Sequence, residues 1–266
     1  MPTEQIVQFL VIAAVLMLSS IVYGTVGFAF GLFANPLLLL AGLPLQAAMA
    51  TASSSMSASS IASLINARRH VQWRALLPVV ITATLMLPLG ALALVQITQL
   101  DRAQMRAVYG SILLVVIVAQ RLLKVRPRPR VHTGWAIVTG VISGFIAGTA
   151  GVGGPPIVLW AVAHDWTGLQ LRATLWAIFV LLVPVQLILL CMAFDSGLIL
   201  FYVAAGLLGL PVVLLGTALG VRIGNRLPIE RLRLAALLLL VFLAAVLIAG
   251  PKLPESAAVA PTVERP

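Results

Sequence analysis

Two glycine-rich stretches followed by proline are the parts of this sequence whose residue types suit ligand binding. They contain Gly27, Gly31, Asn35 and Pro36 in the first stretch, and Gly151, Gly153, Gly154 and Pro155 in the second. The apolar segments at these stretches, 28–41 and 154–163, are shorter than the roughly 17 residues needed to cross a membrane. A helix interrupted at mid-membrane leaves backbone N–H groups free at its N-terminus, where they and the helix dipole favour an anion. We therefore expect an anion site at these breaks, with close helix packing as the alternative role of the glycines.

Hydroxyl side chains are concentrated at the start of the next apolar segment. Thr51 and Ser55 belong to a series with four-residue spacing, so on a helix they share one face, and Ser54 is their neighbour. Hydroxyl groups donate to an oxyanion without the desolvation cost of a buried charge, which suits a site that must release its ligand. We expect these three residues, with Thr174 in the second half, to bind substrate. The alternative is that the hydroxyls bond back to carbonyls one turn earlier.

His164 and Asp165 are the ionisable pair just beyond the second glycine stretch. Ionisable residues near membrane spans are functional candidates, so this pair is expected to gate the site or relay a proton, with a plain interfacial turn as the alternative. The three histidines and the single cysteine are scattered, and no serine has a neighbouring base that suits nucleophilic catalysis. The sequence thus predicts no catalytic residue, no metal site and no cofactor.

The elements that would hold these residues are membrane helices. The chain has 266 residues, of which 61% are hydrophobic and 9% charged, against roughly 45–50% and about 25% in soluble domains. Residues 5–67 contain no Asp, Glu, Lys or Arg, which leaves room for about three membrane crossings. This composition excludes a disordered chain and a soluble enzyme, and the lone Cys191 excludes a disulfide scaffold.

Glycine, proline and charged clusters divide the sequence into two sets of five apolar segments. The predicted helices lie at 5–23, 28–41, 45–66, 75–98 and 103–123, and at 133–150, 154–163, 169–193, 198–221 and 229–249. We expect an all-α polytopic membrane protein with about eight to ten transmembrane helices, segments two and seven being short or broken. The predicted parts are a first transmembrane repeat (1–123), a basic cytoplasmic linker (124–132), a second repeat (133–250) and a disordered tail (251–266).

The two sets resemble each other in sequence. Gly24-Thr-Val-Gly27 corresponds to Gly148-Thr-Ala-Gly151, and Ala50-Thr51 corresponds to Ala173-Thr174, at offsets of 124 and 123 residues. Several landmarks in the same order at nearly one spacing indicate a duplicated unit. Five crossings per unit place equivalent loops on opposite sides of the membrane, so we expect inverted-topology repeats of the kind found in secondary transporters.

The formal net charge of +10 comes from short basic clusters between apolar segments, so no nucleic-acid partner is expected. The clusters follow the segments that end near residues 66, 123 and 221, whereas the loop after the eighth segment carries only Asp195. By the positive-inside rule the basic loops are cytoplasmic, which with ten crossings leaves both termini outside. The predicted location is the cytoplasmic (inner) membrane, with the lipid bilayer as a partner.

In these motifs the sequence resembles the TauE/SafE family of membrane transporters, also called the sulfite exporter family. The resemblance covers nearly the whole chain and rests on the stretch from Gly27 to Pro36, the Gly42-Leu-Pro44 turn, the Ala50-Thr51-Ala-Ser53 helix start, the loop from Arg69 to Arg74, the stretch from Gly148 to Pro156, and Ala173-Thr174. It implies transport, commonly export, of sulfur-containing anions such as sulfite, thiosulfate or organosulfonates. The chain departs from the family pattern at residues 28–30, which thin the first glycine cluster, and at Gln46, where an acidic residue is frequent.

The leading hypothesis is therefore a secondary transporter that exports a small anion, of the sulfite, thiosulfate or organosulfonate type, by alternating access. Its ligand would bind at mid-membrane between the two glycine breaks. A monovalent anion leaving a cell that is negative inside gains about 2.3 kcal/mol per 100 mV, so export needs no buried proton-carrying carboxylate. The alternative from another class is a membrane-embedded enzyme or an accessory subunit without transport activity.

Overall fold

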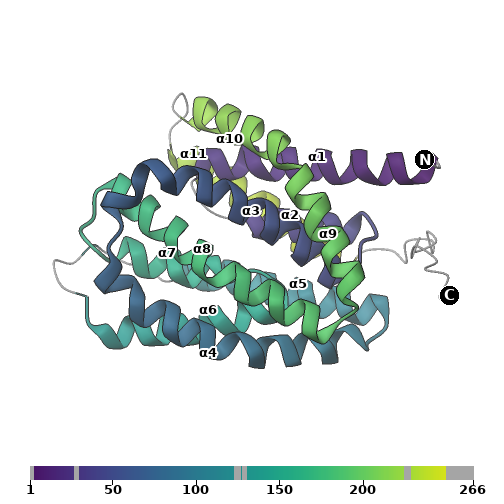
Figure 1. Cartoon of the computed structure of the whole chain (residues 1–266), viewed down its shortest axis with the longest axis horizontal. Coiled ribbons are helices and arrows are strands. Elements are labelled where there is room, and N and C mark those ends of the chain that lie inside the picture. The colour runs from purple at the N-terminus through teal and green to yellow at the C-terminus, as the bar shows by residue number, and fades with distance from the viewer. Residues whose placement is uncertain (1–2, 27–29, 123–126, 128–130, 225–228, 250–266) are drawn as a thin grey trace.

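The computed structural model describes residues 3–26, 30–122, 127, 131–224 and 229–249, and the elements in these ranges are helices (Figure 1). The first half contains α1 (Thr3–Val26), α2 (Phe30–Leu40), α3 (Leu45–Ala67), the 3-10 turn η1 (Arg68–His70), α4 (Trp73–Thr98) and α5 (Arg102–Leu122). The second half contains α6 (Thr133–Ala150), α7 (Gly154–Val162), α8 (Gly168–Ala193), α9 (Ser196–Leu208), α10 (Leu210–Gly224) and α11 (Ile229–Ala249). The chain is an all-α polytopic membrane protein.

The helices follow the predicted segments, with one correction. The segment predicted as a single helix at 198–221 is two helices, α9 and α10, which are bent by 47° at Gly209. Pro211 explains the bend, because proline has no N–H and its ring clashes with the carbonyl four residues earlier. The two short helices are confirmed, since α2 has 11 residues and α7 has 9.

The outer faces of the long helices are apolar. On α4, Leu77, Ile81, Leu85 and Leu89 recur every four residues, and each is more than half exposed. A continuous stripe of this kind is suited to contact with lipid. In the described part of the chain, α4, α5, α6 and α8 are long and apolar enough to cross a membrane, and the bent pair of α9 and α10 would make a fifth span.

Two pairs of helices approach each other closely through glycine. α4 meets α6 where a Cβ added to Gly148 would lie 2.5 Å from the carbonyl oxygen of Leu87. α1 meets α10 where a Cβ added to Gly220 would lie 2.2 Å from the carbonyl oxygen of Ile21. Figure 1 shows the two pairs along opposite edges of the molecule, with α3 and α8 between them.

Buried apolar side chains form two clusters. The first is built mainly on α1, α2, the first half of α3, α5, α9 and α11, and it includes Ala150 and Val152 near the end of α6. The second is built on α4, α7, α8 and the neighbouring end of α3. α2 therefore belongs to one cluster and α7 to the other. The space between the N-terminal ends of these two short helices is the cavity described next.

Candidate functional site

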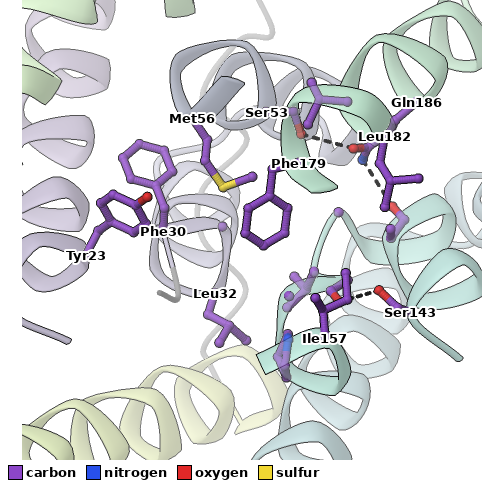
Figure 2. Close-up of a pocket in the computed structure, with 18 residues that line it drawn as sticks. Tyr23, Phe30, Leu32, Ser53, Met56, Ser143, Ile157, Phe179, Leu182 and Gln186 are labelled. Carbon is purple, nitrogen blue, oxygen red and sulfur yellow. Dashed lines mark hydrogen bonds between the residues drawn. The ribbon is translucent and has the colours of Figure 1, made fainter. Parts of the chain in front are cut away.

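A cavity of about 50 Å³ lies between the N-terminal ends of α2 and α7 (Figure 2). One buried water needs roughly 10–15 Å³, so this space holds a few waters or one small anion. The lining comes from α1, α2, α3, α6, α7 and α8, and so from both apolar clusters. Of the residues singled out in the sequence, those in the lining are Gly31, Gly151, Gly153, Gly154 and Pro155. The structure thus brings the two predicted breaks together.

The break before α7 is held by local contacts. Gly151 ends α6 with φ at 69°, a left-handed conformation that favours glycine, and its N–H donates to the Ala147 carbonyl. The Ser143 hydroxyl donates to the Gly153 carbonyl. A Cβ on Gly153 would lie 2.7 Å from the Cβ of Ala147, so a larger residue does not fit there. These contacts attach the start of α7 to α6.

The start of α2 is held against this break by Asn35. The Asn35 side chain is buried, and its Nδ2 donates to the carbonyl oxygens of Ala150 and Gly151, each at 3.2 Å. Gly31 allows the close approach, because a Cβ there would lie 3.0 Å from the Gly151 carbonyl oxygen. Asn35 therefore positions the lining without belonging to it.

Both short helices begin at the cavity lining. The first four N–H groups of a helix have no partner within it. At α7 two of these groups are missing because Pro155 and Pro156 carry no N–H, which leaves the donors of Gly153 and Gly154. α2 presents its first turn, from Phe30 onward, from the other side. Partial positive charge from two helices therefore converges on one space.

The neutral side chains of Gln186 and Ser53 form a polar wall of the cavity. Gln186 lies on α8, and its Nε2 donates to the Ala147 carbonyl at 3.1 Å. Its Oε1 accepts a hydrogen bond from the Ser53 hydroxyl of α3 at 3.4 Å. Figure 2 shows this chain of contacts at one side of the lining and Ser143 at another.

The rest of the lining is apolar and aromatic. Tyr23 and Phe30 stand on one side and Phe179 faces them, with Met56 and Leu32 nearby (Figure 2). Among the described residues that line the cavity, none is charged. A ligand here would be bound by dipoles, hydrogen bonds and apolar contact.

The hydroxyl side chains of α3 that we expected to bind substrate face another helix or bond within α3. Thr51 Oγ1 donates to its own helix at Ala47 and, at 3.3 Å, to the Tyr202 carbonyl of α9. Ser55 donates to the carbonyl of Gly206, also on α9, at 2.8 Å, and Ser54 donates back within α3. These three residues lie outside the cavity lining, and their direct contact with substrate stays a prediction.

Three further predicted positions also lie away from the lining. Thr174 Oγ1 donates to the Gln170 carbonyl and accepts from the backbone N–H of Gln72, so it joins α8 to the loop after η1. Pro36 is buried inside α2. Gly27 lies outside the described residues.

His164 and Asp165 lie beyond the C-terminal end of α7, outside the cavity lining. The His164 ring stacks on Trp166 with centroids 4.1 Å apart and meets Trp160 edge-on at 4.8 Å. Its Nδ1 is 3.0 Å from the Trp160 carbonyl oxygen. Burial lowers the pKa of His164, although this hydrogen bond acts in the opposite direction. Asp165 is exposed, and the predicted gating or relay role of the pair stays a prediction.

Sequence reasoning missed Ser53, Ser143 and Gln186. Gln186 had a visible signal, because it is an uncharged polar residue within the apolar run that follows Arg172. Ser53 is one residue from Ser54, so choosing between them required the rotation of α3 about its axis. Ser143 had no signal that separates it from a packing serine.

The sequence is similar to those of known membrane transport proteins. The family model for Sulfite exporter TauE/SafE matches residues 11–247, from α1 into α11. A curated protein of Cupriavidus necator, described as a probable sulfite/organosulfonate exporter TauE, is 24% identical over 223 residues, which cover 84% of this chain and 86% of that protein. No solved structure matches the chain. Because the family match includes both breaks and nearly every helix, the chain belongs to the sulfite exporter TauE/SafE family of membrane proteins.

Proposed function

We propose that this protein exports a small sulfur-containing anion, such as sulfite, thiosulfate or an organosulfonate, across the cytoplasmic membrane by alternating access. The observation that carries the proposal is the cavity shared by the first turns of α2 and α7. The family and the described activity of the Cupriavidus necator relative supply the class of substrate.

The lining suits an anion that must be bound and then released. Backbone N–H groups of Gly153 and Gly154 and the first turn of α2 attract negative charge. The Nε2 of Gln186 carries a second N–H, which adds a neutral donor to the same space, while the Ser53 hydroxyl donates to the Gln186 Oε1. With no cation in the described lining, release does not require the breaking of a buried ion pair. The aromatic side accommodates the hydrocarbon of an organosulfonate.

The packing of the helices supports two inverted repeats, residues 1–123 and 133–250, joined by the linker 124–132. In the proposed repeat, α1 corresponds to α6, and α4 to the pair of α9 and α10. α1 packs on α10 and α6 packs on α4, so each first helix pairs with the fourth segment of the other repeat. Gly24 and Gly148, 124 positions apart, lie at these two crossings, where they meet Gly220 and Leu87 respectively.

The position of the cavity supports alternating access. Its lining is divided between two apolar clusters, so a movement of one cluster against the other would open it first to one side and then to the other. We place the basic loops in the cytoplasm and both termini outside. The membrane potential then drives the anion outward.

Anion flux in proteoliposomes tests the proposal. Liposomes with purified protein would be loaded with sulfite, thiosulfate, taurine or sulfoacetate, and efflux measured under an inside-negative potential. We expect potential-dependent efflux of at least one anion that protein-free liposomes do not show. Absence of flux for the whole panel would contradict transport and favour the membrane-enzyme or accessory-subunit alternative.

Gly154→Val tests whether the substrate binds in the cavity. A Cβ on Gly154 lies in ordinary contact, 3.6 Å from Phe179 Cζ, so the variant is expected to fold while its side chain occupies the cavity. If this side chain weakens substrate binding by about 1.4 kcal/mol or more, flux at low substrate concentration falls by about tenfold or more. Gly153 is unsuitable, because a Cβ there meets both Ala147 and Ser143 below 3 Å. Unchanged flux in Gly154→Val at normal protein yield would place the substrate elsewhere.

A further inference from the structure

One face of α8 connects the outside of the molecule with the cavity. Arg172, Trp176, Phe179, Val183 and Gln186 are spaced four, three, four and three residues apart, so their side chains follow one stripe of the helix. Arg172 is exposed, Trp176 is half-buried, and the other three line the cavity. The stripe therefore runs from an exposed guanidinium to the polar wall of the cavity.

A hydrogen bond between Trp176 and Tyr23 closes this stripe. Trp176 Nε1–H donates to the Tyr23 hydroxyl oxygen at 2.9 Å. Tyr23 comes from α1, lines the cavity and meets Phe30 edge-on, with ring centroids 6.1 Å apart. Because Tyr23 belongs to the first apolar cluster and Trp176 packs against the second, the bond joins the two clusters between Arg172 and the cavity.

Ser60 is a second hydrogen-bond donor beside the Tyr23 hydroxyl. It lies on α3 four residues after Met56, which lines the cavity, so the two share a face. The Ser60 side chain is 0% exposed, and within the described ranges its Oγ has no hydrogen-bond partner. It lies beside the Tyr23 hydroxyl, on which the charge of Arg172 also acts. Ser60 therefore interacts with the Tyr23 hydroxyl without a well-formed hydrogen bond, and a ligand that displaces Tyr23 would supply the missing partner.

We propose that Arg172, Trp176 and Ser60 form an access site for an oxyanion head group, which the Tyr23 side chain closes. An anion attracted by Arg172 meets the Trp176 N–H and the Ser60 O–H once Tyr23 turns away, and it then passes Phe179 into the cavity. Sulfite and sulfonate oxygens accept both hydrogen bonds. This inference rests on the proposed transport function and adds the path by which substrate reaches the cavity.

The charges at this end of the molecule favour the same ligand. The hydrogen bond from Gln72 N–H to Thr174 Oγ1, 3.1 Å long, holds the loop after η1 against the first turns of α8. Arg68 and Arg69 in η1 and Arg74 in the first turn of α4 flank this loop and are exposed. Several exposed cations raise the local concentration of anions. Arg172 differs from these three because it stands on the α8 stripe.

Flux of sulfite and sulfoacetate at two ionic strengths tests the role of Arg172. Arg172→Gln is expected to raise KM about tenfold in about 10 mM salt and much less in about 500 mM salt, because salt screens the attraction. Arg172→Lys should retain most of the wild-type affinity, and the maximal rate should change by less than about twofold in both variants. Arg74→Gln removes an exposed charge away from the stripe and is the control. Equal changes of KM in Arg172→Gln and Arg74→Gln would overturn the proposal.

Thiol labelling tests the closure by Tyr23 without any flux measurement. In a Cys191→Ala background, Ser53→Cys places one thiol in the cavity wall, and a membrane-impermeant methanethiosulfonate reports access to it. Tyr23→Phe keeps the ring but removes the hydrogen bond to Trp176, so labelling should become about fivefold faster. Ser19→Ala removes another buried hydroxyl, outside the cavity lining, and should leave the rate unchanged.

The outcomes separate this inference from the proposed function. An unchanged labelling rate in Tyr23→Phe would overturn the closure even where the wild type transports anions. Faster labelling without flux of any tested anion would contradict the transport function and leave the closure standing. Slower labelling of the Tyr23→Phe variant in the presence of sulfoacetate, which does not react with the methanethiosulfonate, is the result expected for the complete access site, and Ser60→Ala should reverse it.

Discussion

The two breaks that face the cavity are built differently, although they occupy matching places in the two halves of the chain. The break before α7 depends on contacts within a short stretch, a left-handed Gly151 and a Ser143 hydroxyl bonded to Gly153. α2 depends on Asn35, which reaches 115 and 116 residues along the chain to the carbonyls of Ala150 and Gly151. The residue 124 positions after Asn35 is Leu159, which has no amide.

The difference shows that matching sequences do not imply matching anchors. Each half has a short helix that starts at the cavity. The second-half break is held by its own residues, whereas the first-half helix is docked onto it through Asn35. The site therefore combines a locally fixed half with a half that is positioned by a long-range contact.

The largest effect is expected for Gly151→Ala, which breaks the locally fixed half. A Cβ there would lie 2.6 Å from Asn35 Nδ2 and 2.8 Å from Met49 Cγ, in addition to the positive φ. We expect a loss of about 3 kcal/mol or more in the free energy of unfolding. Gly42→Ala is the control, because Gly42 has φ at 94° but open space around it, and it should cost about 1 kcal/mol. Equal losses of thermal stability in detergent would contradict the tight fit at Gly151.

Asn35→Leu tests the long-range anchor by installing the residue of the second half. Two carbonyls, one of them fully buried, would lose their donor, so the free energy of unfolding should fall by about 2–3 kcal/mol, with lower flux. Asn66→Leu replaces an exposed asparagine at the end of α3 and should change stability by less than about 0.5 kcal/mol. Thermal melts that do not distinguish the two variants would show that α2 docks without Asn35.

Gln186→Leu and Thr51→Val compare a polar side chain that lines the cavity with one that contacts α9. Gln186 lines the cavity, so its replacement should raise KM for the transported anion by about fivefold, the effect of one lost hydrogen bond. Thr51 contacts α9, so Thr51→Val should lower stability by about 1 kcal/mol and leave KM unchanged. A raised KM in Thr51→Val would restore the predicted role of the α3 hydroxyls in binding.

The smallest effect concerns the far end of α7. Because burial lowers the pKa of His164, the folded protein binds this proton less readily than the unfolded chain. The free energy of unfolding that neutral His164 contributes is therefore present above the ordinary pKa of about 6.5, and it is lost as the pH falls. Between about pH 7.5 and pH 5, the melting temperature of the wild type should fall by about 2–4 °C more than that of His164→Phe. This variant keeps an aromatic ring against Trp166. Parallel pH profiles would contradict this reading.

Local signals in the sequence were sufficient for most of the helices. Apolar runs and their Gly, Pro and charged boundaries act within a few residues, so the ends of α4, α6 and α8 lie within two residues of the prediction. The bend at Gly209 is also local in origin, and Pro211 was the available signal. The glycine and proline patterns of both breaks likewise predicted the two short helices and five residues of the cavity lining.

By itself, the sequence determined a polytopic helical membrane protein with two short helices at matching places, because hydrophobic length and helix-breaking residues are properties of single segments. Only the tertiary structure decided which side chains face the cavity. α3 carries serine and threonine on several faces, and its rotation depends on α9, where Gly206 admits Ser54 and the backbone of Thr51 into close contact. That packing turns Thr51 and Ser55 toward α9 and leaves Ser53 to meet Gln186, a pairing across 133 residues that no local pattern specifies.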